Sequence, residues 1–360
     1  MSTLITIQSK SHCYSVEACD NLDAALRALP EEGMLCLADK AVCDLYRSAF
    51  DAVLPATKVL CIEATEEAKS YDALPPVFAW LLSNGLRRNG CLAVVGGGVL
   101  QDIGCFIASV LFRGVRWELI PTTLLAQCDS CIGSKSSLNI QSWKNQLGTF
   151  YPPHRVLLTT SILRTLPRDE IRSGIGEAIK LHLLAGEAEF KTLMEGLDAV
   201  SSDPSTLAPW ILSSLRIKKP FIEQDEFDRD IRNILNYGHT FGHSFESATH
   251  YAIPHGIAVT LGVLAATFTS MRLGLVGAAH YESLKQALRP WHEPYGRELK
   301  AIDLELILGA VKRDKKNTRD AVNCILTRGF GRMEKMPLRL DEDLRPVLAD
   351  FIMSEIEIGH

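Results

Sequence analysis

The sequence predicts a protein of two domains, a parallel α/β domain followed by an all-α domain. The chain has 360 residues, whereas a single hydrophobic core rarely grows beyond about 250–300 residues. Strand-like and helix-like segments alternate in the first part of the chain, and almost all later segments are helix-like. We therefore expect an α/β domain over residues 1–160 and a helical domain over residues 161–360.

Short apolar runs predict the strands of the first domain, and the segments between them have helical periodicity. The predicted strands are Met34–Ala38, Lys58–Ile62, Cys91–Val95 and Trp117–Pro121. The predicted helices are Asp39–Phe50, Pro75–Asn84 and Leu100–Leu111. Strands that alternate with helices favour a parallel sheet with both faces covered.

Amphipathic segments dominate the second domain, where strand-like runs nearly vanish. The predicted helices are Arg168–Ala185, Glu187–Leu197, Leu207–Asp225, Arg229–His250, Gly256–Leu273, Tyr281–Leu288 and Leu304–Lys312. This spacing predicts helices that bury one face each against a shared core.

Composition and charge exclude several classes of partner. The chain is 47% hydrophobic and 22% charged, and its net charge of -5 favours neither nucleic acid nor an anionic membrane. Apolar stretches such as Ile257–Phe268 are too short to cross about 30 Å of hydrocarbon. The start lacks a secretory signal and the ten cysteines are scattered, so we expect reduced thiols in a cytoplasmic protein.

A glycine triplet, Gly96–Gly98, directly follows a predicted buried strand. Such a turn brings backbone N–H groups against a pyrophosphate at a helix N-terminus, but it is equally compatible with a simple tight turn. It also departs from the G-x-G-x-x-G fingerprint, because position 101 is Gln. The polar side chains near the triplet are Asp102, Thr122 and Thr123.

Three histidines between residues 239 and 255 favour a metal site. His239 and His243 share a helix face, and Asn236 is expected on that face three residues earlier. His255 follows a predicted turn, and Glu177 offers a carboxylate on the otherwise apolar stripe of a helix. A single histidine would more often be a hydrogen-bonded core residue, but two histidines and a carboxylate are typical of a catalytic zinc site.

Basic residues recur in apolar or small-residue contexts, where solubility does not require them. Each alone would suit a solvated surface, but together they match a ligand with a phosphate and a carboxylate. They are Arg113, Lys135, Lys144, Lys180, Lys218, Arg232, Lys315 and Lys316.

The order of several motifs resembles that of 3-dehydroquinate synthases and their sugar-phosphate cyclase relatives. The motifs are GGGVLQDIGCF, FRGVRW, PTTLLAQCDSCIGSK, KNQLGTFYPP, SGIGEAIK, NYGHTFGHSFE and PHG, within residues 36–330. The resemblance implies a Rossmann-like NAD-binding domain, a helical metal-binding domain and a homodimer.

The resemblance also implies roles for individual residues. Glu177, His239 and His255 match the metal ligands, for zinc or cobalt. His243 matches a proton-transfer residue, and Lys135, Lys180 and Asn236 match further catalytic positions. The matching substrate positions are Arg113, Asp129, Lys135, Asn145, Lys180, Lys218, Arg232, Asn236, His243 and Lys315 or Lys316. The matching NAD positions are Asp39, Glu66, Lys69, Gly97, Gly98, Asp102, Thr122, Thr123, Lys144 and Thr165.

The implied reaction converts 3-deoxy-arabino-heptulosonate 7-phosphate to 3-dehydroquinate and phosphate. Transient oxidation by NAD+, phosphate elimination, re-reduction and an intramolecular aldol step would follow one another. Two enzymatic alternatives remain: a sibling cyclase for another heptulose phosphate, and a metal-dependent polyol dehydrogenase. A non-enzymatic binding role would require the metal, phosphate and glycine motifs all to be coincidental.

Several positions depart from the family pattern. Gln101, Ser134 and Ser137 stand where relatives usually have glycine, Ser136 where they have threonine, and Asp228 where they have glutamate. Side chains in place of glycines near the nucleotide and substrate positions predict a reshaped pocket.

Overall fold

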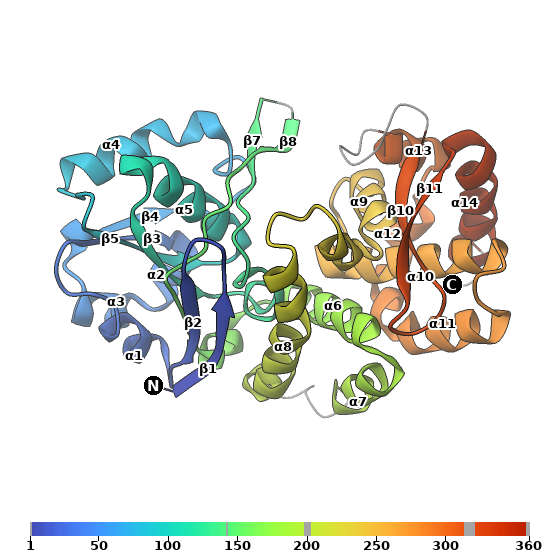
Figure 1. The fold of residues 1–360 in the computed structure, drawn as a ribbon, viewed down its shortest axis with the longest axis horizontal. Coiled ribbons are helices and arrows are strands. Elements are labelled where there is room, and N and C mark those ends of the chain that lie inside the picture. Colours follow the sequence, from blue (N-terminus) through green and yellow to red (C-terminus); the bar gives the residue numbers. More distant parts are fainter. Residues whose placement is uncertain (1, 142, 198–202, 313–320, 358–360) are drawn as a thin grey trace. The chain divides into compact units, whose positions relative to one another are not determined.

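The computed structural model describes residues 2–141, 143–197, 203–312 and 321–357 (Figure 1). Two compact units divide the chain. The first comprises Met1–Pro167 and Ser202–Phe227, and the second comprises Arg168–Ser201 and Asp228–His360.

A seven-stranded sheet forms the centre of the first unit, in the order β1-β2-β9-β6-β5-β3-β4. All neighbouring strands are parallel except β1 and β2, so the predicted parallel sheet is confirmed. The strands are β1 (Ser2–Gln8), β2 (Cys13–Ala18), β3 (Met34–Asp39), β4 (Val59–Ile62), β5 (Cys91–Gly96), β6 (Arg116–Pro121) and β9 (Arg155–Leu158).

A buried carboxylate joins three of these strands. Glu118 on β6 has no solvent exposure, and its carboxylate accepts hydrogen bonds from Arg155 on β9 at 2.7 Å and from Arg116 at 2.6 Å. Arg155 also lies 3.6 Å from Glu17 on β2. Since a buried carboxylate is costly unless it is paired, these arginines stabilise the junction of β2, β9 and β6.

Helices of the first unit pack around this sheet, with α5 against β3, β5 and β6. A small hairpin of β7 (Leu138–Ile140) and β8 (Trp143–Leu147) precedes β9. The helices are α1 (Leu22–Arg27), α2 (Lys40–Leu45), α3 (Arg47–Val53), α4 (Pro75–Ser83), α5 (Gly98–Val110) and α8 (Ala208–Gln224).

The second unit is mainly helical, as predicted, and its centre is the almost entirely buried α10. One antiparallel hairpin, β10 (Val322–Thr327) with β11 (Met333–Leu338), was not expected from the sequence. The helices are α6 (Arg168–Ala185), α7 (Glu187–Leu197), α9 (His239–Ala248), α10 (His255–Arg272), α11 (Ala278–His292), α12 (Gly296–Lys300), α13 (Leu304–Lys312) and α14 (Arg345–Phe351).

A break precedes α9, although the sequence predicted one helix over Arg229–His250. A 3-10 segment, η8 (Ile231–Asn236), ends before Gly238, which has a φ of 80°. Any Cβ at Gly238 would lie 2.7 Å from the Val259 carbonyl oxygen. The expectation that Asn236 continues the helix of His239 is therefore wrong, because a left-handed glycine separates them.

Two glycines allow α6 and α10 to approach at backbone contact. A Cβ on Gly176 would lie 2.2 Å from the Gly256 carbonyl oxygen, and one on Gly256 would lie 1.8 Å from that of Ser173. The Gly256 N–H also donates to the Ser173 hydroxyl at 3.0 Å. The residues beside these glycines, Glu177 and His255, are brought together as a result.

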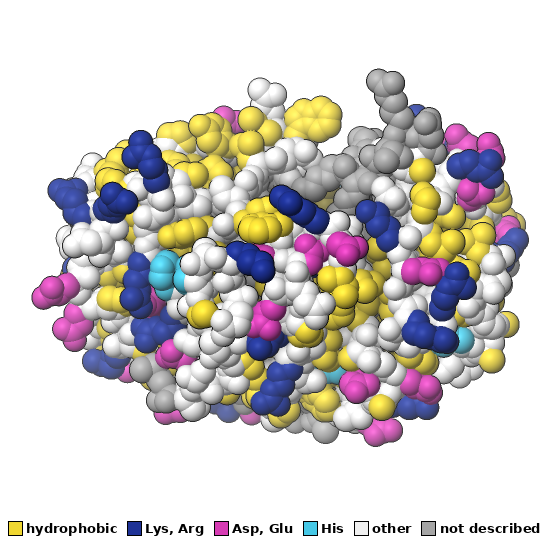
Figure 2. Space-filling view, viewed as in Figure 1, with side chains coloured by type: hydrophobic (Ala, Val, Ile, Leu, Met, Phe, Trp, Pro, Cys, Tyr) yellow, Lys and Arg dark blue, Asp and Glu magenta, His cyan; other side chains and the backbone are white. Residues whose placement is uncertain are grey.

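Charged side chains of both signs are interspersed on the face seen in Figure 2, with apolar side chains between them. Within the described ranges, no helix is long and apolar enough to cross a membrane.

We expect Gly256→Ala to destabilise the protein, because the added methyl would force α6 and α10 apart. Overpacking of this kind costs about 1–3 kcal/mol, and we expect the thermal midpoint to fall by about 3–10 °C in calorimetry. Gly277→Ala is the control, since a Cβ there meets nothing within 4 Å, and it should shift the midpoint by less than about 2 °C. Equal midpoints for the two variants would contradict the close-contact interpretation.

Candidate active site

A buried carboxylate lies at the centre of the candidate site in the second unit. The side chain of Glu177, on α6, is 1% exposed. Its Oε2 lies 2.5 Å from Lys180 Nζ, and its Oε1 lies 3.4 Å from His239 Nε2 and 3.1 Å from His255 Nε2. Among the described residues, neither oxygen accepts a hydrogen bond of ordinary geometry. The arrangement therefore leaves carboxylate lone pairs directed at two imidazole nitrogens.

The three histidines converge from two helix N-termini. His239 and His243 lie one turn apart at the start of α9, and His255 is the first residue of α10. One ring nitrogen from each lies within 4.8 Å of the others, a spacing that could hold a metal ion. The predicted metal ligands are Glu177, His239 and His255. His239 and His255 therefore belong both to that prediction and to this group of histidines.

The protonation of this cluster follows from burial and charge. Burial alone would raise the pKa of Glu177, but the Lys180 ammonium and the two imidazoles hold it well below its usual value. Burial lowers the pKa of His239, despite the nearby Glu177 carboxylate. Burial would also lower the pKa of His255, but the neighbouring carboxylates of Glu177 and Glu246 raise it to about 10. Glu177 is therefore ionised, His239 neutral and His255 protonated near neutral pH.

Glu246 is a site residue that the sequence interpretation missed. It lies on α9, and its Oε1 is 3.2 Å from His255 Nδ1, on the ring side opposite Glu177. A carboxylate on the second ring nitrogen fixes the orientation and tautomer of a ligating imidazole. The spacing of His239, His243 and Glu246 places all three on one helix face, so the motif contained the signal.

The other residues of the second unit that are predicted to bind substrate differ from one another in their environment. Lys180 and Arg232 are buried cations, on α6 and η8 respectively. Asn236 ends η8, where its side-chain amide donates to the Asn233 carbonyl at 3.0 Å. Lys315 and Lys316 lie outside the described residues.

The glycine triplet of the first unit lies where neighbouring parallel strands end. Asp39 ends β3, Gly96 ends β5, and Thr122 follows β6. The chain order reverses between β3 and β5, which is where open α/β sheets bind their ligands. Gly97 caps α5, and a Cβ there would lie 2.7 Å from Thr123, whereas Gly98 faces open space. The first N–H groups of α5 are therefore accessible to an anion.

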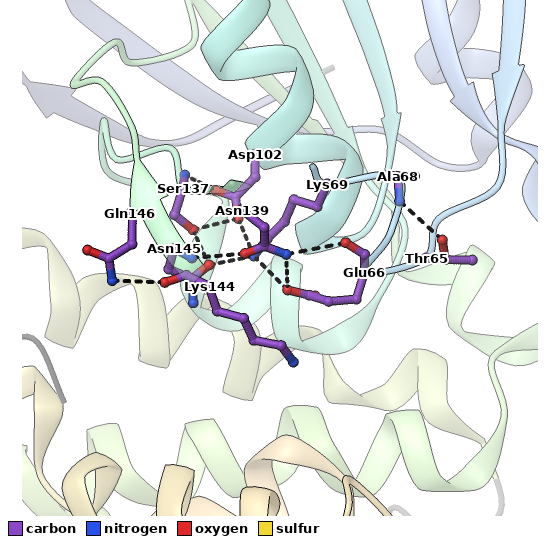
Figure 3. A network of polar contacts seen from close by, with 10 residues as sticks. All are labelled: Thr65, Glu66, Ala68, Lys69, Asp102, Ser137, Asn139, Lys144, Asn145 and Gln146. Atoms are coloured by element: carbon purple, nitrogen blue, oxygen red, sulfur yellow. Dashed lines mark hydrogen bonds and ion pairs between the residues drawn. The ribbon is translucent and has the colours of Figure 1, made fainter. Parts of the chain in front are cut away.

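A polar network joins predicted nucleotide and substrate positions (Figure 3). Lys69 Nζ lies 3.2 Å from Asp102 Oδ2, 2.9 Å from Asn145 Oδ1 and 3.9 Å from Glu66 Oε1. Burial raises the pKa of Asp102, although Lys69 and Ser137 oppose this effect. The structure therefore brings these four predicted residues together.

A second ion pair, elsewhere in the first unit, joins Lys218 of α8 to Asp129. Lys218 Nζ lies 2.7 Å from the Asp129 carboxylate and donates to the Asp129 carbonyl at 2.6 Å. Arg113, Lys135 and Lys144 are instead exposed.

Two further predicted nucleotide residues make local contacts. Asp39 caps α2 by accepting from the Ala41 N–H at 2.9 Å. The Thr165 hydroxyl lies 3.0 Å from that of Tyr46.

Solved structures share this fold. A 2-deoxy-scyllo-inosose synthase complexed with carbaglucose-6-phosphate, NAD+ and Co2+ has a TM-score of 0.81 at 22% identity, with 98% of this chain and 99% of that chain covered. A 2-epi-5-epi-valiolone synthase from Streptomyces hygroscopicus, with NAD+ and Zn2+ bound, has a TM-score of 0.81 at 24% identity, with 96% and 98% covered. These likenesses confirm the predicted fold class.

Sequence comparison adds the family. The profile described as 3-dehydroquinate synthase N-terminal matches residues 59–173, and the C-terminal profile matches residues 174–317. The 3-dehydroquinate synthase of Dictyoglomus turgidum is 36% identical over 310 residues, covering 85% of this chain and 86% of that protein. That of Bartonella quintana is 32% identical over 349 residues, covering 91% and 92%. The resemblance read from the motifs is thus confirmed, and the chain belongs to the 3-dehydroquinate synthase family of sugar-phosphate cyclases.

Proposed function

We propose that the protein converts 3-deoxy-arabino-heptulosonate 7-phosphate to 3-dehydroquinate and inorganic phosphate, as an NAD- and metal-dependent lyase. The observation that carries the proposal is the convergence of Glu177, His239 and His255 in a chain of this family. The 3-dehydroquinate synthases of Dictyoglomus turgidum and Bartonella quintana support this substrate over that of a sibling cyclase.

The proposed metal ligands are Glu177, His239 and His255, and zinc is the proposed ion. Two nitrogens and one carboxylate oxygen, with an open position, are the donors of a catalytic zinc site. Glu177 Oε1 lies within 3.4 Å of two imidazole nitrogens and accepts no hydrogen bond of ordinary geometry among the described residues, so it fits an ion as its partner. His243 is more exposed than the other two histidines, which suits a group that contacts substrate.

The proposed NAD+ site is the end of the parallel sheet in the first unit. The first turn of α5, which begins at Gly98 after the cap residue Gly97, would hold the pyrophosphate. Asp39 at the end of β3 and the Asp102–Lys69 pair would hold the rest of the nucleotide. When bound, NAD+ supplies reversible hydride transfer, and the metal supplies polarisation of a substrate hydroxyl.

The protein's own residues would orient the substrate and move its protons. The buried cations Lys180 and Arg232 of the second unit would bind anionic groups of the substrate. The Lys180 ammonium, whose Nζ lies 2.5 Å from Glu177 Oε2, also keeps that carboxylate ionised. The imidazole of His243 would accept and return a proton at its ring nitrogen. The proposal includes a homodimer, in which the exposed Arg113 is available to a second copy.

The test is phosphate release from 3-deoxy-arabino-heptulosonate 7-phosphate with NAD+ and Zn2+, with and without a chelator. We expect chelator-sensitive release, a product with the mass of 3-dehydroquinate and no accumulation of NADH. Release only from a heptulose phosphate without a carboxylate would assign a sibling cyclase instead. Net NADH production from a simple polyol would assign a dehydrogenase and contradict the proposal.

We expect His255→Ala to abolish metal binding and turnover, because it removes a ligand. Glu246→Gln should weaken Zn2+ binding by about 10–100-fold, because the carboxylate that orients His255 is lost. Elemental analysis and chelator competition measure both effects, and calorimetry should find the affinity for NAD+ unchanged.

Matched controls for these variants are His280→Ala and Glu282→Gln on α11. Both should retain the metal at the level of the unmodified protein. Full metal occupancy in His255→Ala would contradict the ligand assignment, and unchanged affinity in Glu246→Gln would contradict the orienting role.

The affinity for zinc should rise with pH. Because Glu177 and Glu246 raise the pKa of His255 to about 10, the imidazole carries a proton near neutral pH, whereas a ligand must be unprotonated. Binding then releases one proton, and the affinity should increase about tenfold between about pH 7 and pH 8. Calorimetry in buffers of different ionisation enthalpy measures the proton directly. A pH-independent affinity would show that His255 is already neutral.

A further inference from the structure

A serine of the loop before β7 lies within the polar network of Figure 3. The Ser137 hydroxyl is 3.0 Å from Asp102 Oδ2 and 2.9 Å from Asn145 Oδ1. Its backbone N–H donates to Asp102 Oδ1 at 2.9 Å. One residue thus contacts both a proposed nucleotide carboxylate and a proposed substrate amide.

The hydroxyl can reach two acceptors but has one proton. Lys69 also serves both acceptors, since its ammonium lies 3.2 Å from Asp102 Oδ2 and 2.9 Å from Asn145 Oδ1. The Asn145 amide oxygen accepts from this ammonium, and the Ser137 hydroxyl can donate its single proton either to the Asp102 carboxylate or to the Asn145 amide oxygen. When a ligand engages either group, the proton is available to the remaining one.

The contact also involves a residue in the left-handed backbone region. Asn145 has a φ of 56°, a region that asparagine adopts more readily than most residues other than glycine. Its backbone N–H donates to Asn139 Oδ1 at 2.8 Å, and Asn139 Nδ2 in turn donates to Glu66 Oε1 at 2.7 Å. Ser137 therefore holds the side chain of Asn145, while Asn139 holds its backbone.

The backbone at Ser137 does not itself require glycine, because its φ is not positive. Serine in place of the glycine usual at this position therefore causes no backbone strain. What the replacement adds is a hydroxyl between two ligand-binding groups.

We propose that Ser137 is a positioning residue that links the nucleotide-binding carboxylate of Asp102 to the substrate-binding amide of Asn145. The inference rests on the proposed function, because that function assigns NAD+ to Asp102 and the heptulosonate to Asn145. Ser137 acts through these two side chains and not on the reacting atoms, so it affects binding more than the rate of turnover.

The experiment compares Ser137→Ala, Ser137→Gly and Ser137→Thr with the unmodified, Zn2+-loaded protein. Calorimetry gives the Kd for NAD+ without substrate, and phosphate release gives KM and kcat for 3-deoxy-arabino-heptulosonate 7-phosphate. Loss of one such hydrogen bond corresponds to about a threefold to tenfold change. We expect the Ala and Gly variants to raise both Kd and KM by that factor with kcat within about twofold, and Ser137→Thr to restore both.

Ser136→Ala is the matched control, because the Ser136 hydroxyl belongs to the same loop but lies 3.0 Å from Thr149 Oγ1 instead. It should leave Kd and KM unchanged, even if the thermal midpoint falls. Unchanged Kd and KM in Ser137→Ala, with an active unmodified enzyme, would overturn the inference and leave the proposed function intact.

A fall in kcat alone would also overturn the inference, since it would indicate a structural role. If the unmodified protein bound NAD+ but released no phosphate, the proposed function would fail. A weaker Kd in Ser137→Ala that is restored in Ser137→Thr would then still support the link to Asp102.

Discussion

A buried, ionised carboxylate constrains the second unit. Removing a carboxylate from water costs several kcal/mol unless opposite charges and hydrogen-bond donors replace the solvent. Glu177 is 1% exposed, and its partners come from three helices: Lys180 from α6, His239 from α9 and His255 from α10. These helices must therefore meet at one point. The glycines at the α6–α10 contact and the left-handed Gly238 before α9 allow them to do so.

Much of this could be predicted from the sequence because the signals are local. The four strands predicted in the first domain are present, since short apolar runs between helical segments leave few alternatives. The bounds of α6, α7 and α13 agree with the predicted segments, and in α7 and α13 one apolar face alternates clearly with a polar one. The contact between Glu177 and two of the histidines was predicted too, although the expected continuous helix around Asn236 was wrong.

Features that depend on distant residues could not be predicted. Strands β1 and β2 are partly polar, and β9 has only four residues. The pairing of β2 with β9 joins segments that lie far apart in the sequence. The amphipathic pattern of α8 does not show that this helix packs within the first unit. Glu246 could have been predicted, because its spacing from His239 and His243 places it on the same helix face. The contacts of Ser137 with Asp102 and Asn145 could not be predicted, because these side chains come together only in the folded chain.

Three of the lysines predicted to bind ligands are already paired with acidic side chains, two in the first unit and one in the second. Lys69 lies beside Asp102, Lys180 beside Glu177 and Lys218 beside Asp129. An incoming anion must therefore exchange partners with an internal carboxylate rather than fill an uncompensated positive field. Because paired charges largely cancel beyond about one Debye length, these three lysines contribute little to the long-range attraction of a ligand.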